Sequence, residues 1–165
     1  MLAEYHGAFG PAAGFVRDYF NYWETFTTRS QEKIARVMEA TQTSRWRNWA
    51  KAAHEVYAPE SFAPAEALLR QAEQAAGGDE TALARVRFLQ LGLRHAMLCA
   101  RASSRLTLAG SDANDGEIKA VMDEVIRFRR EHELSGIGNF HHLSWEEDLR
   151  WSLGAEAKQP PALYP

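Results

Sequence analysis

The chain has 165 residues, of which 45% are hydrophobic and 25% charged, and its formal net charge is −3 at pH 7. A length of this order suits one domain and allows about 70% of the unfolded surface to be buried, which excludes a largely disordered protein. The slightly negative charge disfavours a dedicated nucleic-acid-binding role. The single cysteine, Cys99, excludes an internal disulfide, and its apolar neighbours predict a small core residue rather than a reactive thiol.

Hydrophobic residues recur at helical spacing in nearly every segment, and the alternation typical of strands appears in none. The first predicted helix starts at Gly10-Pro11, because proline is favoured in the first helical turn. One face of this helix carries an aromatic stripe made of Phe15, Tyr19, Tyr22, Trp23 and Phe26. Polar residues at 27–30 weaken the helix before a second periodic piece at 34–38, and the polar stretch 41–44 predicts a loop.

The middle of the chain predicts three further helices. A short helix is expected between Trp46 and Val56, followed by a turn over Ala58–Ser61. The next helix covers Phe62–Ala76, and Gly77-Gly78-Asp79 ends it and caps its successor. The longest predicted helix runs from about Asp79 to Leu108. Because it is apolar on two faces, we expect it at the centre of a bundle.

The C-terminal third predicts a turn-rich connector at 109–116 and a helix from about Ile118 that stops near Gly136. A capping-box pattern at Ser144 predicts a last short helix, and the segment 155–165, with three prolines, predicts a flexible tail. The fold class is therefore all-α. We expect a single bundle of about five to seven helices over residues 1–154 with a long central helix.

No complete catalytic, metal-binding or cofactor-binding constellation is recognisable in the sequence. Adjacent histidines such as His141-His142 rarely hold one metal, and no second ligand pair at helical spacing accompanies them. The acidic run at 146–148 lies at a predicted helix start, where carboxylates complement the helix dipole. The sequence therefore predicts no catalytic residue, no metal and no cofactor for this chain.

Arg127 and His132 are the one pair that indicates an enzyme. Their spacing resembles the Arg-x4-His motif of small all-helical ribonuclease domains of the HEPN type, in which the two side chains act on an RNA phosphodiester. The position after the arginine is usually polar in that motif, whereas here it is Phe128. A basic end of an amphipathic helix produces the same pattern.

The chain contains five tryptophans, and exposed aromatic rings stack on the faces of sugars. Large aromatics are more often core or interface anchors, so most of these rings are expected to be buried. The candidate glycan or partner surface consists of Trp46, Trp49, His141, His142 and Trp145.

Three segments resemble the helical region of large glycoside-hydrolase-like bacterial proteins. The first is Tyr5–Ala13, continued by Val16 and Tyr19; the second is Phe62–Leu69, continued by Ala72; the third runs from Arg85 to Leu93. That family is described only as a domain of unknown function, and a TIM-like barrel precedes its helices. The likeness covers Tyr5 to about Leu106 and consists mainly of packing residues, so no functional residue is carried over from it.

The resemblance implies a non-catalytic helical accessory module that is part of a larger carbohydrate-active protein. Its expected partners are the missing barrel domain or a second copy of the chain, with a glycan as a possible ligand and neither nucleic acid nor membrane. The alternatives are the HEPN-like ribonuclease with Arg127 and His132, or a stand-alone protein-interaction module. The chain carries no signal-peptide pattern and no apolar stretch long enough to span a membrane, and the cellular compartment stays open.

Overall fold

The structure is a computed structural model that describes residues 2–41, 49–108 and 115–143. Every regular element in these ranges is helical, which confirms the all-α class and the bundle with a long central helix. The elements in chain order are α1 (Leu2–Phe9), η1 (Gly10–Ala12), α2 (Ala13–Arg29), α3 (Gln31–Ala40), α4 (Trp49–Val56), α5 (Pro59–Ala76), α6 (Glu80–Leu108), α7 (Asp115–Glu131) and η2 (Glu133–Ser135).

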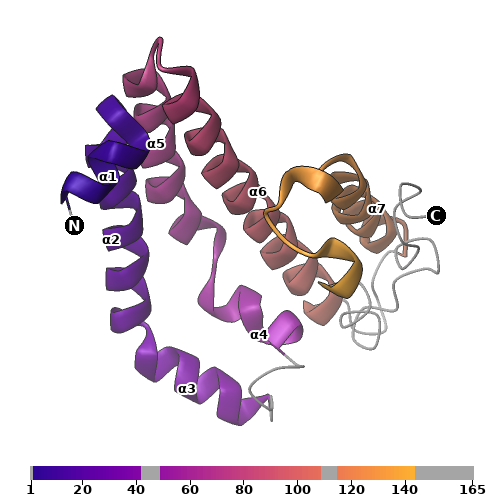
Figure 1. Ribbon diagram of the computed structural model, residues 1–165. Helices are drawn as coiled ribbons and strands as arrows, with labels where there is room; N and C mark the ends of the chain where they lie inside the picture. The colour runs from indigo at the N-terminus through magenta and orange to yellow at the C-terminus, as the bar shows by residue number, and fades with distance from the viewer. Residues whose placement is uncertain (1, 42–48, 109–114, 144–165) are drawn as a thin grey trace.

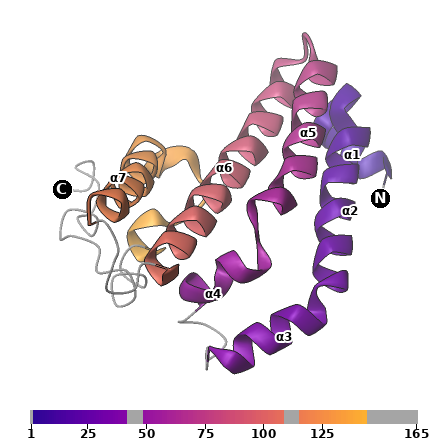
Figure 2. The same ribbon diagram turned by 180° about the vertical axis from the view of Figure 1, so that it is seen from behind.

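The helices are arranged around α6. In both views α5 lies between α2 and α6, and α7 lies on the other side of α6 (Figures 1 and 2). Helices α3 and α4 lie at the far end of α2, where α4 packs against the C-terminal half of α6 (Figure 1). Because α6 contacts α1, α4, α5 and α7, it is the element on which most of the bundle depends.

The N-terminus contains a helix that sequence patterning does not predict. Helix α1 precedes Gly10, where the first helix was expected to begin, and the three-residue η1 joins it to α2. Gly10 has a φ of +48°, and a Cβ there would lie 2.9 Å from a carboxylate oxygen of Asp79. Glycine is therefore required at this break, both for the backbone conformation and for the close approach to the start of α6.

The expected turn at Ala58–Ser61 is wrong, because α5 already begins at Pro59. Proline occupies the first turn of the helix, where its missing N–H is not needed. The Ser61 hydroxyl donates to the Ala58 carbonyl at 2.7 Å, and Tyr22 of α2 donates to the Ser61 carbonyl at 2.6 Å. Residues that resemble a turn in the sequence therefore form the first turn of α5.

The junction between α5 and α6 agrees with the sequence-based expectation. Gly77 has a φ of +50° and ends α5, and the Asp79 carboxylate accepts the Ala82 amide hydrogen at 2.9 Å. Successive faces of α6 enter three apolar clusters: one with α1, α2 and α5 around Val86, one with α2 and α5 around Leu93, and one with α7 around Leu98. This sharing explains why α6 is apolar on more than one face.

Beyond α7 the chain passes through η2 and reaches a short helical turn at 140–143. The Asn139 side chain accepts the amide hydrogen of His142 at 3.0 Å and caps that turn. The expected helix from Ser144 and the tail 155–165 lie outside the described residues. No helix in the described part of the chain is long and apolar enough to cross a membrane.

Candidate functional site

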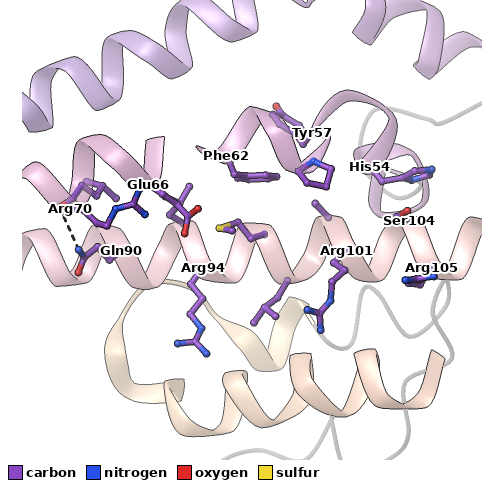
Figure 3. Close-up of a pocket in the computed structure, with 16 residues that line it drawn as sticks. His54, Tyr57, Phe62, Glu66, Arg70, Gln90, Arg94, Arg101, Ser104 and Arg105 are labelled. Carbon is purple, nitrogen blue, oxygen red and sulfur yellow. Dashed lines mark hydrogen bonds between the residues drawn. The ribbon is translucent and has the colours of Figure 1, made fainter. Parts of the chain in front are cut away.

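A groove of about 950 Å³ runs along α6, beneath the end of α4 and the first half of α5. Its floor extends from Gln90 to Arg105, which is about 22 Å at the helical rise of 1.5 Å per residue. In Figure 3, Tyr57, Phe62 and Glu66 project over α6 from the α4–α5 side, whereas Arg94 and Arg101 extend toward α7. A volume of this size is at the upper end of the range that small-molecule sites occupy.

The middle of the groove is apolar. Helix α6 contributes Leu93 and Met97, and the opposite wall contributes Tyr57, Phe62 and Leu69. Phe62 and Leu69 are almost fully buried, so they form the base of this wall rather than an exposed stacking platform. Tyr57 is only half-buried, and its ring contacts Phe62 with 6.5 Å between centroids. The groove therefore presents a hydrophobic centre with one accessible aromatic ring.

The rim and the ends of the groove carry four arginines, which are Arg70, Arg94, Arg101 and Arg105. Arg101 forms an ion pair with Glu124 of α7, and Arg105 lies 3.6 Å from a carboxylate oxygen of Glu117. Arg94 lies over the Phe128 ring, with 5.9 Å between its Cζ and the ring centroid. Neither Arg94 nor the exposed Arg70 forms an ion pair with a described residue. Glu66 is the one acidic side chain among the described residues of the lining.

Ser103 and His54 form a polar pair at one end of the groove. Ser103 is fully buried on α6, and its Oγ lies 3.0 Å from Nδ1 of His54 and 3.4 Å from the His54 backbone nitrogen. Such a pair resembles the serine–histidine arrangement of acyl-transfer enzymes. A nucleophile must reach its substrate, however, and the Ser103 hydroxyl has no access to the groove, so the serine orients the imidazole instead.

A second polar cluster lies between α6 and α7. Arg129 is only 4% exposed, and its Nε donates to Nε2 of His95 at 3.0 Å while a terminal nitrogen lies 3.5 Å from the Cys99 sulfur. Burial, and then the Arg129 charge, lowers the pKa of His95 to about 4. The imidazole is therefore neutral at pH 7 and accepts the guanidinium hydrogen. Cys99 is part of this packed cluster, as expected for a core cysteine.

The candidate glycan surface falls only partly within the described residues. Trp49 is the first residue of α4, and His141 and His142 are exposed in the turn that follows α7. Trp46 and Trp145 lie outside the described residues. Neither His141 nor His142 lines the groove, and the glycan surface stays a prediction.

The Arg127 and His132 pair also stays a prediction. Arg127 is exposed on the last turns of α7, whereas His132 follows the helix end and packs on the Phe128 ring with 4.5 Å between centroids. Because α7 ends at Glu131, helical spacing does not place the two side chains on one face of a helix.

No pattern in the sequence predicts that the residues lining the groove lie together. Ser103 has no base near it in sequence, yet His54, 49 residues away, lies 3.0 Å from its hydroxyl oxygen. Arg87, Arg94 and Arg101 recur every seven residues, which predicts a solvated edge of the long helix, and the structure places Arg94 and Arg101 of this stripe at the groove. Only the position of α4 makes this stripe one side of a cavity.

The groove contains hydrogen-bond donors and apolar surface, a combination that suits ligand binding. Across residues 2–41, 49–108 and 115–143, no three His, Cys, Asp or Glu side chains are close enough to hold a metal ion. Comparison with protein-family models, with curated proteins and with solved structures found no match.

Proposed function

We propose that this chain is a non-catalytic helical accessory module of a larger carbohydrate-active protein, and that it binds a ligand in the groove along α6. The observation that carries the proposal is the groove itself, with a volume of about 950 Å³ and polar groups at both ends of an apolar centre. Such an arrangement is typical of ligand sites, where apolar surface supplies affinity and a few polar groups supply orientation.

The carbohydrate context rests on the resemblance of Tyr5–Leu106 to the helical region of glycoside-hydrolase-like proteins. The resembling segments belong to α1, α2, α5 and α6. Of these helices, α5 and α6 also form the groove, so the resembling part of the chain includes its main walls. Saccharide rings have apolar faces and hydroxyl edges, which Tyr57 and the polar side chains Gln90 and Ser104 complement.

Isothermal titration calorimetry with maltotriose, cellotriose and trigalacturonate tests the proposal, and we expect at least one saccharide to bind. Met97→Trp adds an indole at a half-buried groove position and is expected to abolish that binding. Ala96→Trp adds the same ring at the exposed neighbouring position outside the groove and serves as the matched control. Circular dichroism establishes that both variants keep the helical content of the parent chain.

Two results contradict the proposal: no saccharide binds, or binding is equally weakened by both tryptophan variants. Light scattering on the same samples distinguishes saccharide binding from the alternative, in which the chain is an association module. A mass that rises with protein concentration, without any saccharide effect, favours association. The exposed apolar side chains of Phe88 and Leu134 favour such a protein contact, because each leaves a large apolar surface in water.

A further inference from the structure

The end of the groove nearest the C-terminus of α6 is rich in hydrogen-bond donors. His54 from α4 and Ser104 and Arg105 from α6 line this end together (Figure 3). Each of them provides N–H or O–H groups, and among the described residues the lining of this end includes no carboxylate, although Glu117 of α7 lies 3.6 Å from Arg105. Glu66 of α5, the one acid among the described lining residues, lies near Arg94 in Figure 3, away from this end of the groove.

Ser103 lies against one ring nitrogen of His54. The His54 backbone N–H donates to the Ser103 oxygen at 3.4 Å. The same oxygen lies 3.0 Å from Nδ1, and in the tautomer in which the hydroxyl hydrogen donates to Nδ1 the ring proton resides on Nε2.

This tautomer turns His54 into a donor. Nε2 lies on the opposite edge of the ring from Ser103 and has no hydrogen-bond partner among the described residues. The Ser104 hydroxyl likewise has no partner in the described part of the chain, and it is half-exposed. Arg105 is 59% exposed at 3.6 Å from Glu117, so this loose ion pair leaves several of its five N–H groups for a ligand.

We infer that the groove binds a ligand with a carboxylate group, held by His54, Ser104 and Arg105, and with an apolar or ring-faced body along Tyr57 and Met97. The inference rests on the proposed function insofar as the groove is the binding site of the module. A guanidinium, an imidazole N–H and a hydroxyl suit a singly charged carboxylate. The acidic residues Glu66, Glu117 and Glu124 around the groove disfavour a doubly charged phosphate.

Two classes of ligand carry a carboxylate on an apolar or ring-faced body, namely acidic saccharides and fatty acids. Trigalacturonate and octanoate are the two probes, and maltotriose and 1-octanol are their uncharged counterparts. Calorimetry with the full chain is expected to show that at least one carboxylate binds tenfold or more tightly than its uncharged counterpart. Binding of trigalacturonate alone assigns an acidic saccharide, and binding of octanoate alone assigns a fatty acid.

Substitutions at the donor end test the placement of the carboxylate. Arg105→Gln removes the charge at an exposed position and is expected to weaken carboxylate binding about tenfold, the effect of one charge-assisted hydrogen bond. Arg87→Gln makes the same change on α6 outside the groove, and we expect no effect on binding. Long-range ¹H–¹⁵N spectra are expected to show the Nε2–H tautomer of His54 in the parent chain. In Ser103→Ala, His54 is expected to lose its preference for this tautomer.

The inference is overturned if neither carboxylate outcompetes its uncharged counterpart, or if Arg105→Gln and Arg87→Gln weaken binding equally. These outcomes are separable from failure of the proposed function. Binding of maltotriose without trigalacturonate or octanoate overturns the carboxylate assignment and leaves a saccharide-binding module. Binding of octanoate with no saccharide supports the carboxylate assignment and overturns the carbohydrate role. Absence of binding by all four probes overturns both.

Discussion

The cluster of His95, Cys99 and Arg129 shows how burial sets the chemical state of single side chains in this protein. A guanidinium that is 4% exposed needs acceptors, and neutral His95 supplies one through Nε2 at 3.0 Å. The ring also stacks on Phe128, with 5.8 Å between centroids and 19° between planes. Burial disfavours the charged imidazole, and protonation also places a second positive charge beside Arg129; these two causes lower the pKa of His95.

Stability is therefore expected to fall as the pH is lowered from about 6.5 to about 4, the ordinary and the lowered pKa of His95. In this range the unfolded chain binds a proton at His95 and the folded chain does not, which favours unfolding. Below about pH 4 both states are protonated and the contribution of His95 no longer changes. The total is up to about 3 kcal/mol, reduced by the partial exposure of the ring.

Urea denaturation at pH 7 and pH 4.5 measures this dependence in the parent chain and in His95→Leu. We expect the variant to lose most of the pH-dependent difference in the free energy of unfolding between these two conditions. His142→Leu, at an exposed histidine, is the control and should retain the difference. Equal pH dependence in the parent and in His95→Leu contradicts the assigned lowering of the His95 pKa.

Helix ends show how single elements of the bundle are delimited. Pro59, Gly77 and Asp79 each lie at a helix boundary, and all three act through local backbone chemistry. Gly10 differs, since its positive φ allows a break after α1 and its missing side chain leaves room for Asp79 of the distant α6 start. Asp79 therefore serves two boundaries, as the cap of α6 and as the neighbour of Gly10.

Removal of the Asp79 carboxylate is expected to destabilise the start of α6. Asp79→Ala eliminates the hydrogen bond to the Ala82 amide and should lower the free energy of unfolding by about 1 kcal/mol. Asp79→Asn keeps an acceptor oxygen and should cost less. Thermal unfolding followed by circular dichroism measures both variants. Equal losses in the two variants would show that charge, and not capping, makes the contribution.

The whole molecule is held together through α6. Of the four apolar clusters formed by the described residues, three include residues of α6, and the fourth, between α3 and α4, is joined to α6 by the packing of α4. Loss of one cluster exposes one face of α6, and the other clusters depend on the same helix. The described residues are therefore expected to unfold as one cooperative unit.

Urea unfolding followed by far-ultraviolet circular dichroism and by tryptophan fluorescence tests this cooperativity, and we expect the two midpoints to coincide. Val86→Ala, in the cluster of α6 with α2 and α5, and Val125→Ala, in the cluster of α6 with α7, remove buried methyl groups at opposite ends of the bundle. Each substitution should lower the free energy of unfolding by roughly 1–3 kcal/mol and shift both midpoints together to lower urea concentration. Two separate transitions, each shifted by only one variant, would establish two independent units.

Most helices of this bundle could be predicted from the sequence, because helical periodicity, proline at a first turn and glycine at an end act within a few residues. The long helix was expected from Asp79 to Leu108 and is found from Glu80 to Leu108. Helix α1 was missed because its eight residues carry no clear apolar stripe. Ala58–Ser61 was misassigned because proline and serine suit a turn as well as a first helical turn.

The sequence by itself determined the helical class and the central position of α6. Only the tertiary structure decided that Ser103 meets His54, that Arg129 is buried on His95, and that the arginine stripe of α6 borders a groove. The physical reason is the range of the interactions. Periodicity and capping depend on neighbours three or four residues apart, whereas these contacts depend on how helices 30 to 50 residues apart pack together.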